Sequence, residues 1–228
     1  RETIQQLQAD GVWDMNRELE LATPTLRIAI ISSATAAGFQ DFSQEIARSP
    51  YRFKLTLFES LMQGDAAEHS VVAALDAIAM REEEFDAVVI IRGGGSISDL
   101  ALFDSYLIAT HVAQFPLPIF SGIGHDKDIS VVDMVAHTAL KTPTAVATKL
   151  VEMADYEMNI IDSFASDIAA MVDNRLYQED MRIYQLGTDI ERRATAHIND
   201  CHKHIELIQS ALQSRLELIF STEEQRLS

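Results

Sequence analysis

The residues best suited to chemistry in this sequence fall in three short segments, each directly after an apolar run. The first segment is SSATAAG at 32–38, followed by Asp41. The second is RGGGS at 92–96, and the third is GIGHDKD at 122–128. The preceding apolar runs have the length of strands, so the three segments are predicted to be loops at strand ends. Because parallel strands bring their carboxyl ends to one edge of a sheet, we expect the loops to form one site.

The second loop has the composition of a phosphate-binding loop. Gly93, Gly94 and Gly95, followed by Ser96, allow the backbone to approach an anion closely and to direct N–H groups at it. Arg92 adds a planar guanidinium that suits bidentate hydrogen bonding to a phosphate. The alternative is a tight turn between a strand and a helix, with a solvent-exposed arginine.

The third loop contains the candidate acid–base group. His125 follows a glycine, and carboxylates stand close by at Asp126 and Asp128. An imidazole beside a carboxylate is the usual arrangement for a general acid or base, because the neighbour orients the ring and keeps it basic. The alternative is a surface histidine in an acidic loop.

The net charge is unusual for a protein with an anion site. The chain has 18 basic and 35 acidic residues, a formal net charge of −17, which argues against tight nucleic-acid binding by the chain as a whole. Between positions 85 and 141, however, the basic residues are Arg92, Lys127 and Lys141, each in or beside one of the loops. This placement favours one local anion site and makes Lys127 a further phosphate-binding candidate.

Two groups of side chains have types that can bind metals: the carboxylates Asp41, Asp99, Asp128 and Asp133, and, at helical spacing, His197, Cys201 and His204. The carboxylates suit Mg²⁺, but acidic residues in first helical turns are equally explained by the helix dipole. The second group suits zinc, although such a face is more often a coiled-coil seam.

These loops require a particular set of elements to position them. Apolar runs are expected to form strands at 26–32, 51–58, 86–91 and 117–120, and the stretches 39–47, 65–80, 97–112 and 128–136 are expected to be helices. Near-continuous apolar strands that alternate with helices predict the α/β class, as a Rossmann-like parallel sheet flanked by helices. A short helix near the N-terminus precedes this region.

From about residue 145 the pattern changes. Apolar residues recur at spacings of three and four, with charged residues between them, which predicts a long amphipathic helix or coiled coil. Such a helix must fold back or meet a partner chain to bury its apolar stripe. The expected organisation is a linker helix at 1–25, an α/β core at 26–147 and a helical arm at 148–228. No apolar run reaches the length of a membrane span, and Cys201 is the one cysteine, so a cytoplasmic location is expected.

The loops resemble the motifs of the exodeoxyribonuclease VII large-subunit family. The family's patterns correspond to SSATAAGFQD at 32–41, IRGGGSISDLALF at 91–103, GHDKD at 124–128 with Asp133, and TPTAVA at 142–147. Four motifs in the right order and at the right spacing are far more specific than any one alone. The sequence departs from the family's pattern at Ile91, Ser98, Asp126 and Ala139, the last of which usually is an arginine.

The resemblance implies a nuclease that hydrolyses phosphodiester bonds of single-stranded DNA to oligonucleotides. It carries the catalytic positions onto Asp41, Arg92, His125 and Asp128, and it implies that a divalent metal is not always required. Asp41 either completes a proton relay with His125 or, with Asp128, binds a Mg²⁺ ion. The resemblance also implies that the helical arm binds the family's small subunit in a hetero-oligomer. An OB-fold that binds single strands is expected before Arg1, and the sequence is expected to be cut at both ends.

Two other functions remain open at this stage. A non-catalytic helical assembly subunit would need the arm but not the loops, and it would be expected to lose Arg92 or His125 first. An enzyme that acts on a small phosphorylated metabolite would need the pocket but not the arm. Both residues and the long apolar stripe are present, which favours the nuclease.

Overall fold

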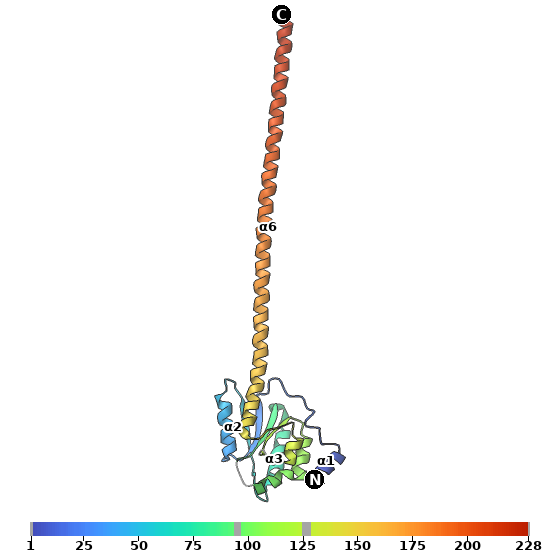
Figure 1. Ribbon diagram of the computed structural model, residues 1–228, viewed down its shortest axis with the longest axis vertical. Coiled ribbons are helices and arrows are strands. Elements are labelled where there is room, and N and C mark those ends of the chain that lie inside the picture. The colour runs from blue at the N-terminus through green and yellow to red at the C-terminus, as the bar shows by residue number, and fades with distance from the viewer. Residues whose placement is uncertain (1, 94–96, 125–128, 228) are drawn as a thin grey trace. The chain divides into compact units, whose positions relative to one another are not determined.

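The computed structural model describes residues 2–93, 97–124 and 129–227, and of 97–99 and 223–227 it describes the backbone only. The strands are β1 (Arg27–Ser32), β2 (Lys54–Glu59), β3 (Ala87–Ile91), β4 (Ile119–Gly122) and β5 (Thr138–Ala139). The helices are α1 (Glu2–Ala9), α2 (Ala37–Arg48), α3 (Ala67–Ala79), η1 (Glu82–Glu84), η2 (Ile97–Asp104), α4 (Tyr106–Ala113), α5 (Val131–Val135) and α6 (Pro143–Leu227) (Figure 1). Contacts divide the chain into unit 1, Arg1–Asp162, and unit 2, Ser163–Ser228.

The core of unit 1 is a parallel sheet with the strand order β2-β1-β3-β4-β5. Central strand β1 pairs with β2 on one side and β3 on the other, so that Ile30 lies between Leu57 and Val89. All five residues of β3 are buried, as expected for a strand covered on both faces. The predicted α/β class with a parallel sheet is therefore confirmed.

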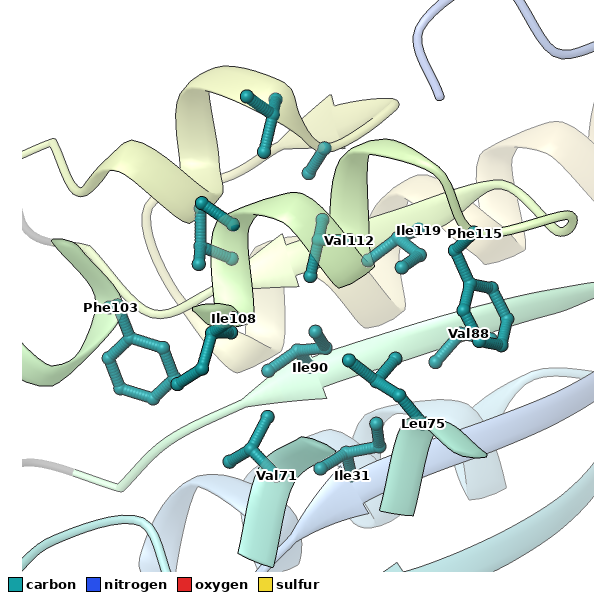
Figure 2. Packing of buried hydrophobic residues seen from close by; sticks show 14 of the residues in the cluster. Ile31, Val71, Leu75, Val88, Ile90, Phe103, Ile108, Val112, Phe115 and Ile119 are labelled. Carbon is teal, nitrogen blue, oxygen red and sulfur yellow. The ribbon is translucent and has the colours of Figure 1, made fainter. Parts of the chain in front are cut away.

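Alternate residues of the strands point to opposite faces of the sheet and contribute to two separate hydrophobic clusters. Figure 2 shows Ile31, Val88 and Ile90 packing against residues of α3 and α4 on one face. On the other face, Ile28, Ile30 and Val89 pack with buried residues of α2 and of the first turns of α6. These two layers fix the sheet between helices, which sets the positions of the loops at its ends.

The sequence predicted neither the short helix η1 nor strand β5, and it predicted a single helix at 97–112. The helix predicted at 97–112 is two elements, η2 and α4, because Ser105 between them caps α4 by accepting a hydrogen bond from the amide of Leu107 at 3.1 Å. The Ser105 hydroxyl also donates to Glu68 of α3, which holds the break against the neighbouring helix. The two-residue strand β5 was not predicted, since a pair of residues has no recognisable period.

The segment before β1 is tied to the far side of the sheet by one buried amide. The side chain of Asn16 donates to the carbonyls of Phe115 and Leu117 at 3.1 and 2.9 Å. It accepts from the amides of Ile119 and His137, both at 3.0 Å. One side chain thereby satisfies four backbone groups at the edges of β4 and β5.

A charged group holds the amino ends of β1 and β3 together. The carboxylate of Asp86 accepts from the amides of Leu26 and Arg27 and from the Arg27 guanidinium at 2.6 Å. Burial alone would raise the pKa of Asp86, but the hydrogen bonds from Arg27 and Leu26 outweigh it and hold the pKa below its usual value.

Helix α6 begins with a conventional cap and then changes in character. Thr142 accepts from the amide of Ala145 at 3.1 Å, and Pro143 occupies the first helical position. The large apolar side chains of unit 2 that the structure describes are exposed, from Phe164 at 63% to Phe220 at 68%. Along the described residues, no helix is both long and apolar enough to cross a bilayer.

Replacing Asn16 by alanine is expected to destabilise unit 1 strongly. The Asn16→Ala variant removes four hydrogen bonds and leaves backbone groups of β4 and β5 without partners, at a cost of about 3 kcal/mol or more. Thermal denaturation should show a fall in Tm of about 6–12 °C. The control, Glu18→Ala, changes an exposed side chain two residues away and should leave Tm nearly unchanged.

The Asp86→Asn variant is expected to lower stability in a pH-dependent way. The folded-state pKa of Asp86 is lowered, so its ionised form stabilises the fold above about pH 4, and this contribution is lost as the pH falls through the folded-state pKa. Urea denaturation should show a deficit of about 2 kcal/mol at pH 7 that shrinks at pH 3. An equal deficit at both values would show that the charge is not its source. Asp14→Asn, in an exposed pair with Arg17, is the control.

Candidate active site

The loops after β1 and β3 meet where the strand order reverses, which is where doubly wound sheets bind ligands. They enclose a pocket of about 340 Å³ together with the loop after β2. Its lining residues are Ser33, Thr35, Ala36, Ala37, Leu61, Met62, Gln63, Arg92 and Gly93. None of these described residues is acidic and Arg92 is basic, so the pocket is suited to an anion.

The two loops approach each other closely because residue 38 is a glycine. A Cβ at Gly38 would lie 2.4 Å from the carbonyl oxygen of Arg92 and 2.8 Å from Cγ of Pro143. Real Cβ atoms are not found at such distances, so any other residue would force these segments apart. Gly38 therefore sets the position of the Arg92 loop relative to α2.

The amino end of α2 faces this loop. Its N-cap, Ala36, supplies no side-chain hydrogen bond to the helix. The nitrogens of Ala37 and Gly38 would lie 3.3 and 3.5 Å from a Cβ built on Gly93, so these helix-initiating amides face the glycine loop. Helix N-termini carry a partial positive charge, and here that charge reinforces the Arg92 side of the pocket.

The start of α6 packs against the same edge of the sheet. A Cβ at Gly122 would lie 2.8 Å from Cγ2 of Val146 and 3.3 Å from the nitrogen of Pro143. The TPTAVA segment is thus placed beside the ends of β3 and β4 by a second close contact that requires glycine. This segment belongs to the site region through packing, although it does not line the pocket.

The structure places only some of the predicted site residues. Arg92 is 8% exposed at the end of β3, and Gly93 lies beside it in the pocket. Asp41 is exposed in the second turn of α2 and is not among the pocket-lining residues. Gly94, Gly95, Ser96, His125, Lys127 and Asp128 lie outside the described residues.

The third loop is flanked by a buried polar network. Asp133 accepts from the hydroxyl of Ser121 at the end of β4, and from the amide and hydroxyl of Ser130 at 3.0 and 2.8 Å. Ser130 in turn caps α5, which completes a capping box. Both oxygens of Asp133 are used in this way, so its role in the structure is to fix the two ends of the loop at 122–130.

The described residues contain no group of three side chains placed to bind a metal ion. In unit 2, Sγ of Cys201 lies 3.9 Å from Nε2 of His197 on the same helix, and the thiol is exposed. This contact follows from their i, i+4 spacing alone.

The third wall of the pocket was not predicted from the sequence. Leu61, Met62 and Gln63 follow β2, whose carboxyl end is at the same edge as those of β1 and β3. The strand order would have identified them, because any loop next to the switch point can contribute to the site. Their residue types carry no motif, so composition gave no signal.

These features define a doubly wound α/β protein with a candidate anion pocket at its topological switch point. Within that class, the sequence model of "Exonuclease VII, large subunit" matches residues 12–228. The chain therefore belongs to the exonuclease VII large-subunit family.

Curated relatives agree with this assignment. The chain is 30% identical over 203 residues to the exodeoxyribonuclease 7 large subunit of Lactobacillus helveticus, which covers 87% of this chain and 45% of that protein. It is 28% identical to that of Cyanothece sp., over 95% of this chain and 53% of the relative. Over 62% of this chain and 31% of the relative, it is 38% identical to that of Lacticaseibacillus casei. The chain spans about half the length of the first two relatives.

The Gly38→Ala variant is expected to disrupt the site. The added methyl group would meet the backbone oxygen of Arg92, which cannot rotate away, so the loop must shift. Such overpacking typically lowers the free energy of unfolding by about 1–3 kcal/mol. The shift of the Arg92 loop should also weaken phosphate binding. Thermal denaturation and a phosphate titration measure the two effects.

Gly187→Ala is the matched control. Gly187 lies in α6 with open space around it, so the same substitution should stabilise the helix by about 1 kcal/mol. If Gly38→Ala left both Tm and phosphate binding unchanged, the close approach would not position the loop.

Proposed function

We propose that this chain contains the nuclease site of an exonuclease VII large subunit, which hydrolyses phosphodiester bonds of single-stranded DNA to oligonucleotides. The observation that carries the proposal is the pocket in which Arg92, Gly93 and the amino end of α2 converge. Family membership supplies the reaction, since the relatives are named as exodeoxyribonucleases. The motif positions supply the remaining residues.

The scissile phosphate is held by the second loop. Arg92 donates to its non-bridging oxygens, and the amides of residues 93–96 add further donors, with Lys127 as a second cation. Such donors act mainly in the transition state, when negative charge accumulates on those oxygens. The burial of Arg92 strengthens its effect, because little water screens it.

The proton transfers are assigned to the third loop. Water attacks phosphorus, an O–P bond forms, and the bond from phosphorus to the leaving sugar oxygen breaks. His125 accepts the proton of the attacking water, or donates one to the leaving oxygen, and Asp128 orients the imidazole. The network of Asp133, Ser121 and Ser130 supports this loop from both ends.

Asp41 is the fourth residue of the proposed machinery. As an exposed carboxylate on α2 it can extend the proton relay, or it can bind Mg²⁺ together with Asp128. When bound, Mg²⁺ would neutralise charge on the phosphate. The steps above rest on the chain's own residues.

The helical unit 2 is proposed to bind the small subunit of the enzyme. Its apolar residues are exposed at helical spacing, and water is a poor environment for so many of them. The exposed residues of this stripe include Phe164, Ile168, Met171, Ile183, Ile190, Ile198, Ile205, Leu212 and Ile219. A helix of this kind is stabilised when partner helices cover the stripe.

The test is cleavage of end-labelled DNA by the full-length protein assembled with its small subunit. His125→Ala and Arg92→Ala should each lower kcat on single-stranded DNA by about 10²–10³-fold or more, with double-stranded DNA a poor substrate throughout. Arg92→Lys, which keeps the charge but not the bidentate geometry, should retain part of the activity. Reactions with Mg²⁺ and with EDTA determine the role of Asp41.

Two controls separate chemistry from assembly. Each variant should form the same complex with the small subunit and unfold at the parent's Tm. A fully active His125→Ala enzyme would refute the assigned mechanism, and an inactive parent complex would favour a non-catalytic assembly subunit.

A further inference from the structure

The pocket beside Arg92 is larger than a phosphate site requires. Its volume of about 340 Å³ is at the lower end of the range of about 300–1,000 Å³ found for small-molecule sites. Arg92 and Gly93 form only one part of its lining. The remainder therefore has room for a group attached to the phosphate.

The wall after β2 presents one exposed apolar side chain, Leu61, and hydrogen bonds hold its backbone in place. Leu61 is 56% exposed, although it follows a strand end, whereas its neighbour Met62 is 7% exposed and belongs to the core. The amide of Leu61 donates to Oγ of Ser70 at 3.0 Å, and the buried Ser60 donates to the same oxygen at 3.0 Å. Helix α3 thus fixes the backbone that presents Leu61 to the pocket.

Apart from Arg92, the polar side chains of the pocket are neutral groups that can both donate and accept hydrogen bonds. The Gln63 side chain offers an amide that both donates and accepts, and the hydroxyls of Ser33 and Thr35 lie 3.2 Å apart on the opposite loop. One exposed apolar side chain, Leu61, next to neutral donors and acceptors matches a nucleoside, whose base has an apolar face and a polar edge. Enzymes that bind a base commonly pack apolar side chains against its face and hydrogen-bond its edge.

On the basis of the proposed function, we infer that this pocket binds the nucleoside attached to the scissile phosphate, with Leu61 packing against the base and Gln63 contacting its polar edge. The phosphate lies at the Arg92 and Gly93 end. The pocket thereby sets which bond of the strand reaches the reacting groups. Because the contacts are generic, all four bases should be accepted with similar affinity.

The inference is tested by comparing dTMP, thymidine and inorganic phosphate as ligands of the full-length complex, by calorimetric titration. The parent should bind dTMP at least about tenfold more tightly than inorganic phosphate. Leu61→Ala combined with Gln63→Ala should weaken dTMP by about five- to tenfold, the lower part of the range for base stacking, since leucine is aliphatic. The same variant should leave inorganic phosphate unchanged.

Both substituted side chains are exposed, so folding is not at risk. Met80→Ala is the matched control, because Met80 is 86% exposed at the end of α3 and lies outside the pocket lining. It should bind dTMP as the parent does. On single-stranded DNA the double variant should raise KM and change kcat little.

The outcomes separate this inference from the function on which it rests. Equal affinities for dTMP and inorganic phosphate in the parent, or unchanged dTMP binding in the double variant, would overturn the nucleoside subsite alone. An Arg92→Lys variant that bound phosphate like the parent would instead overturn the proposed phosphate role of Arg92. Failure of the parent to bind either phosphate-containing ligand would overturn both.

Discussion

The close approach of Gly38 to the carbonyl of Arg92 is the constraint on which the site depends. The parallel sheet brings the ends of β1 and β3 to one edge, but adjacent strands alone leave their loops free to diverge. The missing side chain at Gly38 lets α2 begin directly against both the Arg92 carbonyl and the ring of Pro143. A pocket lined by Arg92 and by Ala36 and Ala37 at the start of α2 forms at this contact, so backbone packing contributes to the electrostatic character of the site.

This arrangement also explains how so acidic a chain can contain an anion site. With 35 acidic and 18 basic residues, the long-range field of the protein repels a polyanion. Screening limits that repulsion to about 8–10 Å at physiological salt, whereas the contacts in the pocket are made at hydrogen-bond distance. A pocket whose described lining residues include no carboxylate, and in which Arg92 is buried, can bind one phosphate locally. Binding of a long strand would then require groups outside this pocket. The acidic composition is therefore compatible with the proposed DNA substrate.

The sequence predicted the fold where the signal is local and the site where it forms a motif. Near-continuous apolar runs such as 86–91 identified the strands of a parallel sheet, and the structure confirms them. The break at Ser105 was missed, because the serine that caps α4 is also held by Glu68 of α3, which is adjacent in space but 37 residues away in sequence. Arg92 and Gly93 were recognised from the glycine run, and the structure places them in a pocket. Leu61 and Gln63 were not predicted as site residues, because only the strand order shows that the loop after β2 adjoins the switch point.

The two units differ in how far their apolar residues are buried, and this difference bears on function. Unit 1 buries its apolar residues within itself, in the two clusters on either face of the sheet. In unit 2, residues such as Phe164 and Ile168 are more than half exposed. A partner that covered them would gain a binding free energy of about 25 cal/mol for each Å² of apolar surface removed from water. Selection for solubility would remove such a stripe unless a partner covered it. The exposed stripe is the observation behind the proposed assembly surface, while Gly38, Arg92 and Gly93 have the geometry of a binding site. A chain with only one of these features would fit a simple scaffold or a small-molecule enzyme, and the proposed nuclease subunit requires both.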